Sequence, residues 1–329
     1  MSIARSENVL WQRGWLRPWL RSAAVLLPLV VVAAVVAGNW ELIGSSAGRL
    51  GEADRKWLAG SCLAAFLTWV CSATAQQGAV VEPLPPGRLL ATQFAASAAN
   101  HILPAGVGGN AVNLRFLLRR GLSPSRAVGA LAVRTCATVT GRLVLLGLVL
   151  AFFPGALHIR RVIAGGSVVP AHPLLLVAAV ALLLTGGYVA TRCARRLRDR
   201  ARAFLASAAT DVRALHRNRA RVAALWGGGL AFPAMHALVV VMVMRALHSP
   251  VPVSGVVAAY LCASTAAGWL PTPAGLGSLD AALALALVTA GAPAVTATSA
   301  VLGYRLATTW LPLVPGVMVL AVLVRRREL

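Results

Sequence analysis

Two similar phrases rich in glycine and proline interrupt apolar stretches of the chain. Residues 103–109 read LPAGVGG and residues 272–278 read TPAGLGS. Proline ends a helix, while glycine permits a sharp reversal and lets a bound group approach the backbone closely. The N–H groups at the start of the next helix could then bind an anion such as phosphate. The glycines that we expect in such a site are Gly106, Gly108, Gly275 and Gly277.

A carboxylate and an arginine follow the second phrase. Asp280 is the only acidic residue in any segment that we expect at membrane depth, where an unpaired carboxylate is costly. Arg305, which lies near the middle of the last expected span, is the best partner for it. The pair could clamp two helices together, contact a substrate or carry a proton, and the sequence leaves these alternatives open.

Arginines and amides follow the first phrase. Arg115 lies about two turns beyond it, and Arg134 is the approximate counterpart of Arg305 in the first half of the chain. Asn110 could donate hydrogen bonds or cap a helix, as could Asn100, His101 and Asn113. Guanidinium groups beside helix N-termini suit a phosphate. We therefore predict a substrate-binding site that contains Arg115, Arg134, Arg305, Asp280 and Asn110 together with the four glycines.

The composition places these residues in a membrane. Of the 329 residues, 58% are hydrophobic and 12% are charged, and the mean hydropathy is +0.76. Soluble domains are far more polar, and apolar runs long enough to cross a bilayer recur along this chain. Basic residues number 31 against nine acidic ones. Because the arginines gather at the ends of apolar runs, they indicate membrane orientation and headgroup binding rather than nucleic-acid binding.

We predict an all-α polytopic membrane protein with about six full transmembrane helices. The spans are expected at about 22–40, 57–75, 126–153, 171–191, 221–247 and 294–323. Two further apolar regions, 88–118 and 253–290, hold the glycine phrases. Their arms are shorter than the roughly 30 Å hydrocarbon layer, so we predict that each is a re-entrant helical hairpin.

The phrases also indicate an internal repeat. An offset of 169 positions relates Pro104 to Pro273 and also Pro124 to Pro293. Each half then has three spans and one hairpin, and an odd number of spans inverts the second half relative to the first. The expected divisions are a cytoplasmic amphipathic lead over 1–21, a first repeat over 22–160 and a second repeat over 161–329, with a basic cytoplasmic segment at 192–221. This segment places both termini in the cytoplasm.

Both phrase regions resemble the lysylphosphatidylglycerol synthase transmembrane region, also called the flippase-like family. The likeness is carried by NHILPAGVGGNAVNLRFLLRRGLSPSRAVGALAVR and by GWLPTPAGLGSLDAALALALVTAGAPAVTATSAVLGYRLATTWLP. Asp280 stands where the family usually has glutamate, and Gly109-Asn110 stands where it tends to have Gly-Glu. A mechanism that needs those glutamates does not transfer to this chain.

The resemblance implies a bacterial inner-membrane protein that moves or handles phospholipid-like molecules. Some members are fused to a soluble aminoacyltransferase domain. No such domain occurs in these 329 residues, so we expect that the chain is not itself the synthase.

The favoured function is a lipid translocator for an anionic or glycosylated phospholipid. The alternatives are a membrane glycosyltransferase or other lipid-modifying enzyme, with Glu52 and Asp54 as its acids, and a scaffold that transports nothing. We expect no cofactor and no metal, because the histidines and cysteines lack ligand spacing. The expected partners are a membrane phospholipid or lipid-linked substrate, and anionic headgroups at 192–221. We expect no nucleic acid; a second copy of the chain or a separate transferase is a further candidate partner.

Overall fold

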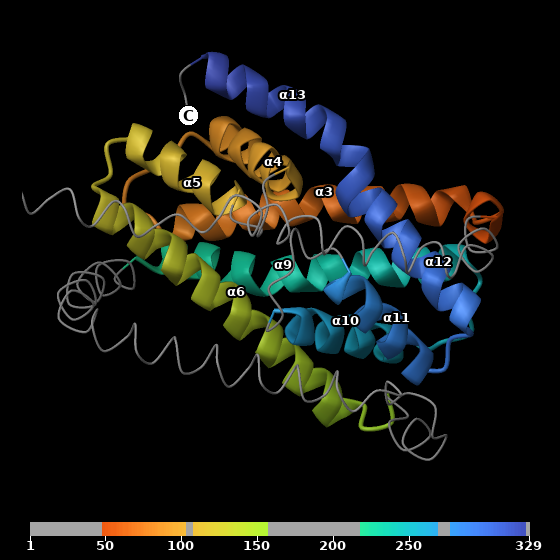
Figure 1. Ribbon diagram of the computed structural model, residues 1–329. Coiled ribbons are helices and arrows are strands. Elements are labelled where there is room, and N and C mark those ends of the chain that lie inside the picture. Colours follow the sequence, from red (N-terminus) through yellow and green to blue (C-terminus); the bar gives the residue numbers. More distant parts are fainter. Residues whose placement is uncertain (1–47, 103–107, 157–217, 269–276, 327–329) are drawn as a thin grey trace, which may run out of the picture. The chain divides into compact units, whose positions relative to one another are not determined.

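The structure, a computed structural model, describes residues 48–102, 108–156, 218–268 and 277–326. All regular structure within these ranges is helical (Figure 1). In chain order the helices are α3 (Arg55–Gly78), α4 (Pro86–Ile102), α5 (Gly108–Arg119), α6 (Pro124–Phe152), α9 (Arg219–Ala246), α10 (Val253–Ala267), α11 (Ser278–Thr289), α12 (Ala294–Arg305), the π-helical turn η3 (Leu306–Trp310) and α13 (Leu311–Arg325).

Four helices in the described part of the chain are long and apolar enough to cross a membrane. They are α3, α6, α9 and the continuous helix formed by α12, η3 and α13. These four match the spans predicted at 57–75, 126–153, 221–247 and 294–323. The spans predicted at 22–40 and 171–191, the lead over 1–21 and nearly all of segment 192–221 lie outside the described residues. The chain is thus a multi-pass helical membrane protein.

The helices α3 and α9 run antiparallel and pack along their length (Figure 1). At one end the Asp54 N–H donates to the Ala246 carbonyl at 3.0 Å, and at the other the Arg221 guanidinium donates to the Val80 carbonyl. Glycine makes this approach possible, because a Cβ on Gly228 would lie only 2.6 Å from the backbone nitrogen of α3 residue 75. In lipid, close packing of this kind is a main source of helix association.

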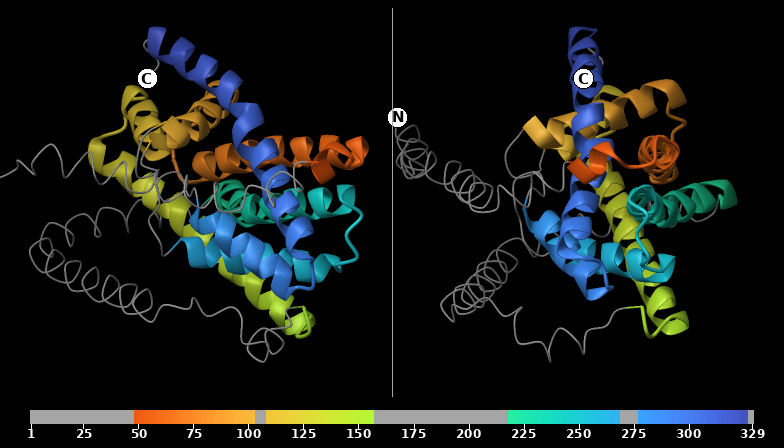
Figure 2. Two further views of the ribbon diagram at one scale, coloured as in Figure 1. Left: turned by 45° about the vertical axis from the view of Figure 1, so that its right-hand side comes forward. Right: turned by 90° about the vertical axis from the view of Figure 1, so that its right-hand side faces the viewer.

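Two pairs of short helices lie against these spans. The helix α4 packs against α5, and α10 packs against α11 (Figure 2). A Cβ on Gly108 would lie 2.1 Å from the Ala99 carbonyl oxygen, so glycine lets the start of α5 abut the end of α4. The pairs occupy the regions predicted as hairpins at 88–118 and 253–290. Their tips, at 103–107 and 269–276, lie outside the described residues.

The helices α5 and α11 end in the same way. The Leu122 N–H donates to the Leu117 carbonyl at 3.3 Å, and the Ala292 N–H donates to the Leu287 carbonyl at 3.0 Å. These bonds require a residue in the left-handed region, and glycine at positions 121 and 291 supplies it with φ of 85° and 103°. A proline begins or precedes the next long helix in each case.

The longest helices pack across the molecule in a reciprocal pattern. The helix α6 contacts α9 and α10, whereas α13 contacts α4 and the turn η3 contacts α3. The last helix of each predicted half therefore packs on the first described long helix and on the short pair of the other half.

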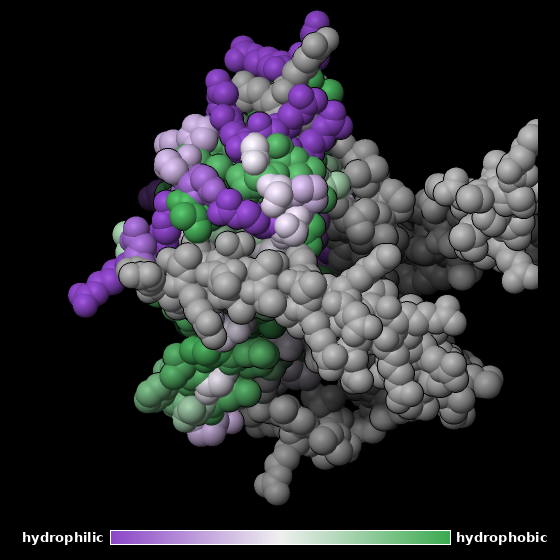
Figure 3. All heavy atoms as spheres, turned by 90° about the vertical axis from the view of Figure 1, so that its left-hand side faces the viewer, coloured by the Kyte–Doolittle hydropathy of each residue, from purple (hydrophilic) through white to green (hydrophobic). Residues whose placement is uncertain are grey.

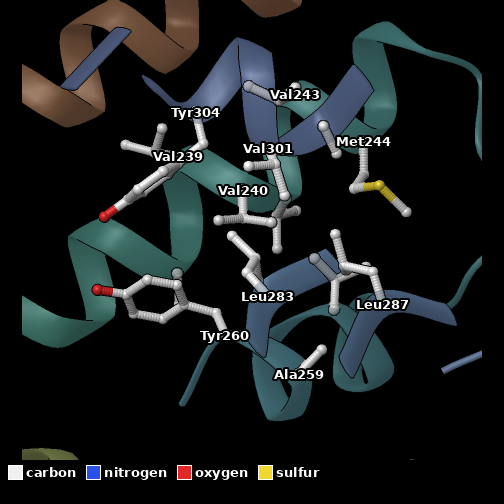
Figure 4. Close-up of a cluster of buried hydrophobic side chains, with 14 of the residues drawn as sticks. Val239, Val240, Val243, Met244, Ala259, Tyr260, Leu283, Leu287, Val301 and Tyr304 are labelled. Carbon is white, nitrogen blue, oxygen red and sulfur yellow. The ribbon is translucent and has the colours of Figure 1, made fainter. Parts of the chain in front are cut away.

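An apolar core joins α9, α10, α11 and α12. Figure 4 shows valines and Met244 of α9 packed against Leu283 and Leu287 of α11 and Val301 of α12. Tyr260 and Tyr304 lie at one edge of this cluster, with both hydroxyl groups on the same side (Figure 4). The core therefore fixes the position of Tyr304 and of its neighbour Arg305.

The surface is divided by polarity. Figure 3 shows hydrophilic side chains gathered toward one end of the face that it views and hydrophobic ones below them. The exposed arginines at helix ends include Arg88 of α4, Arg119 of α5 and Arg325 of α13. Exposed apolar side chains follow α6 and α13, including Leu148 and Met318. This division suits a headgroup layer at one end and hydrocarbon along the helices.

Candidate functional site

A polar cavity of about 260 Å³ lies between the helices of the two predicted halves. Its lining comes from α3, α4, α5 and α6 on one side and from α9, α12 and η3 on the other. Arg134 of α6 and Arg305 of α12 both line it, although 171 positions separate them in the chain. Packing of the long helices therefore brings two guanidinium groups to one enclosure.

Arg134 is held by neutral groups. Its Nη1 donates to the Gln93 Oε1 at 3.1 Å and to the Ser72 hydroxyl at 3.3 Å, while that hydroxyl donates to the same Gln93 oxygen at 2.9 Å. No carboxylate pairs with Arg134 among the described residues. Its positive charge is therefore positioned by α3 and α4 but is not neutralised by them.

A chain of amides continues from Gln93 into the first short pair. The Gln93 Nε2 donates to the Asn113 Oδ1 at 2.7 Å, and the Asn113 Nδ2 donates to the Gly109 carbonyl at 2.8 Å. The Gly109 N–H in turn donates to the Asn100 Oδ1 at 2.7 Å. These bonds satisfy backbone groups at the start of α5 and connect α4 and α5 to Arg134.

The ion pair predicted between Asp280 and Arg305 is present. The Arg305 Nε donates to the Asp280 Oδ1 at 2.6 Å and Nη2 donates to Oδ2 at 3.1 Å, a bidentate arrangement. The Gly277 N–H also donates to Oδ2, at 3.0 Å. Gly277 has φ of 90°, which a residue with a Cβ rarely adopts. The start of α11 is thereby clamped to the last long helix.

An aromatic cluster forms another part of the wall. The Tyr304 hydroxyl and the His236 Nδ1 are hydrogen-bonded at 3.0 Å, and both residues line the cavity. Tyr260 stacks on the His236 ring with centroids 6.1 Å apart. The sequence reasoning missed this cluster. The only available signal was that single polar or aromatic residues occur within apolar helices 221–247 and 294–323.

The predicted site residues divide into three groups. Arg134, Arg305 and Asn110 line the cavity, and Asp280 reaches it through Arg305. Gly108 lets α5 pack closely on α4, and Gly277 precedes the start of α11, while Gly106 and Gly275 lie outside the described residues. Arg115 is exposed and does not line this cavity.

Several polar groups in the wall remain available to a ligand. The Asn110 side chain makes no hydrogen bond to another described residue, and the buried Nδ1 of His101 likewise has no partner among them. Hydroxyl groups of Ser97 and Thr309 also face the cavity. Together with Arg134, these groups could hold an anion that also carries hydrogen-bonding substituents.

Glu52 and Asp54, the acids considered for an enzyme, lie at the start of α3. Asp54 caps α3, where its Oδ1 accepts the Lys56 N–H at 2.8 Å, and Glu52 is exposed in the preceding turn. Within the described ranges no group of three or more His, Cys, Asp or Glu residues is placed to hold a metal ion. Neither acid lines the cavity.

Comparison with protein families gives a match over most of the chain. The family described as "Lysylphosphatidylglycerol synthase TM region" matches residues 16–316. A search of curated proteins finds no match to this chain. The matched range includes both short helix pairs and every residue that lines the cavity. The family suggested by the two glycine phrases is therefore confirmed.

Proposed function

The chain belongs to the lysylphosphatidylglycerol synthase TM region family, and we propose that it is a translocator for an anionic or glycosylated phospholipid in a bacterial inner membrane. The observation that carries this proposal is the pair of arginines, Arg134 and Arg305, in the wall of one cavity shared by both predicted halves. A polar enclosure between apolar helices can hold a headgroup while the lipid tails stay in the bilayer.

The chemistry of the wall favours a phosphate. A guanidinium group binds phosphate oxygens through charge-assisted hydrogen bonds, which are about twice as strong as neutral ones. Arg134 carries a charge that no described carboxylate neutralises, and amides surround it. A phosphate bound beside it would replace the missing counterion.

We also propose that the two halves form an inverted repeat around this cavity, with the tips of the short pairs as re-entrant hairpins. Three observations support the proposal. The described part of each half has the order long helix, short pair, long helix. Both short pairs end at a glycine with positive φ, and the last helix of each half packs on the other half. In transporters built this way the substrate binds at the repeat interface.

The proposed orientation places the arginine-rich end of the described helices in the cytoplasm. The ends of α4, α5 and α13 that carry exposed arginines lie beside the start of α9, because residues of all four ends share one apolar cluster. The helix α9 follows the basic segment 192–221. Positive charge is retained on the cytoplasmic side of bacterial inner-membrane proteins.

Reconstitution tests the translocator. The purified chain in liposomes should equilibrate a fluorescent phosphatidylglycerol between leaflets, as measured by quenching with a membrane-impermeant reductant. We expect Arg134→Gln to slow this movement at least tenfold, since a hydrogen bond to a charged group contributes about 1.5–3 kcal/mol and 1.4 kcal/mol is a factor of ten.

The matched control is Arg119→Gln, which removes an exposed arginine at the end of α5. It should leave the rate unchanged. Equal rates for protein-containing and protein-free liposomes would reject the translocator, and equal slowing by both variants would reject the cavity as the path.

A further inference from the structure

We infer that the cavity selects a lipid whose phosphate carries an uncharged, hydroxyl-bearing headgroup and that it rejects headgroups bearing an amine. The inference rests on the proposed function and narrows its substrate class. It comes from the composition of the cavity wall, which has positive charge and many neutral polar groups but no acidic residue among those described.

The charge of the wall is positive. Arg305 is neutralised by Asp280, whereas Arg134 has no carboxylate partner among the described residues. The two histidines in the wall, His101 and His236, can only add positive charge. The negative charge of one phosphate balances this excess positive charge. A headgroup that also carries an ammonium group would bring the excess positive charge back.

An ammonium group would find no free carboxylate in this cavity. None of the described lining residues is acidic, and Asp280 is the described carboxylate that is bonded to a lining residue, Arg305. Its oxygens already accept the Arg305 Nε, the Arg305 Nη2 and the Gly277 N–H. Burying a cation without a carboxylate costs several kcal/mol, so an amine headgroup is disfavoured.

Neutral polar groups are plentiful by contrast. The side chain of Asn110 is exposed and makes no hydrogen bond to another described residue, and Ser97 and Thr309 offer hydroxyl groups. Amides and hydroxyls both donate and accept, which matches the hydroxyl groups of glycerol, inositol or a sugar. Unlike Gln93, Asn100 and Asn113, Asn110 lies outside the chain of amide hydrogen bonds, so a carboxylate can be introduced there without breaking a bond between described residues.

The volume of the cavity suits the polar part of a lipid. At about 260 Å³ the cavity is smaller than the roughly 300–1,000 Å³ typical of drug-sized ligands. It is therefore suited to the phosphate and a small headgroup, with the acyl chains outside.

Retained lipid tests the selectivity. The full chain is reconstituted in nanodiscs of equimolar dioleoylphosphatidylglycerol and dioleoylphosphatidylethanolamine, extracted in mild detergent and examined by native mass spectrometry. We expect phosphatidylglycerol to exceed phosphatidylethanolamine at least tenfold in the retained lipid. Asn110→Glu should shift that ratio about tenfold toward phosphatidylethanolamine, whereas the neutral variant Asn110→Gln should preserve it.

The outcomes separate this inference from the translocator. Equal retention of the two lipids by the unmodified chain, or an unchanged ratio in Asn110→Glu, overturns the selectivity. If both lipids are retained equally but both move between leaflets, the selectivity is rejected and the translocator is supported. Selective retention without movement rejects the translocator but keeps the selectivity, and retention of neither lipid rejects both.

Discussion

At the scale of residues, the Asp280–Arg305 pair is the contact whose loss should most affect stability. The Arg305 side chain is 8% exposed and that of Asp280 is 27% exposed. Removing one partner of a buried pair typically costs about 3–5 kcal/mol, and partial exposure of the carboxylate lowers this. We expect Asp280→Asn to cost about 2 kcal/mol of unfolding free energy, as measured by thermal unfolding in detergent.

The control is the double variant Asp280→Asn with Arg305→Gln. Because it removes both charges, it should be more stable than the sum of the two single losses predicts. Strict additivity of the single effects would mean that the two side chains do not interact.

The sequence could predict this pair but not the whole wall. A lone acid at membrane depth needs a partner, and few arginines lie at that depth. The partners of Arg134, by contrast, are brought together by packing of helices distant in sequence. The structure does not bring Arg115 to this cavity, because distance along the chain from the glycine phrase ignores the direction of the side chain around the helix. Arg115 lies two residues from the buried Asn113, about 200° around α5 and on its opposite face.

At the scale of elements, the contact between α3 and α9 depends on one glycine of three in a row. A Cβ on Gly228 would lie 2.6 Å from the Ala75 nitrogen and 2.7 Å from the Cys71 carbonyl oxygen, whereas one on Gly227 would meet nothing within 4 Å. We expect Gly228→Ala to cost about 1–3 kcal/mol because two backbones must separate. Thermal unfolding followed by tryptophan fluorescence measures the loss.

Gly227→Ala is the matched control in the same helix. It should be neutral or slightly stabilising, since alanine favours a helix over glycine by about 1 kcal/mol. Equal destabilisation by the two variants would contradict the close approach of α3 and α9 and would indicate a general need for glycine in this helix.

The positions of the long helices could be predicted from sequence, but a local change of helix type within one of them could not. Length and hydropathy located the four described spans, because crossing the hydrocarbon layer requires about 20 apolar residues. The turn η3 inside the last span was not predicted. It has a physical source in Pro312, which cannot donate to the Thr308 carbonyl, and in the Leu311 N–H, which donates to the Leu306 carbonyl five residues back. The turn follows Arg305 and carries Thr308 and Thr309 into the cavity wall.

In the molecule as a whole, the reciprocal packing is consistent with the proposed repeat. Each short pair needs a break and a tight turn, so the same proline and glycine types recur at nearly the same offset. The side chains between these points differ because each half contacts different neighbours. The two arginines accordingly have different partners, amide and hydroxyl for Arg134 and a carboxylate for Arg305.

The proposed inverted arrangement predicts that equivalent positions face opposite sides of the membrane. Ser125 near the start of α6 and Ala294 at the start of α12 are exposed and differ by the repeat offset of 169. In a chain whose five native cysteines are replaced by alanine, Ala294→Cys should react with a membrane-impermeant maleimide added to intact spheroplasts. Ser125→Cys should react only after the membrane is opened, because the proposed orientation places it in the cytoplasm. Both thiols must react fully under denaturing conditions, which controls for expression. Labelling of both from the same side would exclude an inverted repeat, because two halves inserted in the same sense present equivalent helix starts to one compartment.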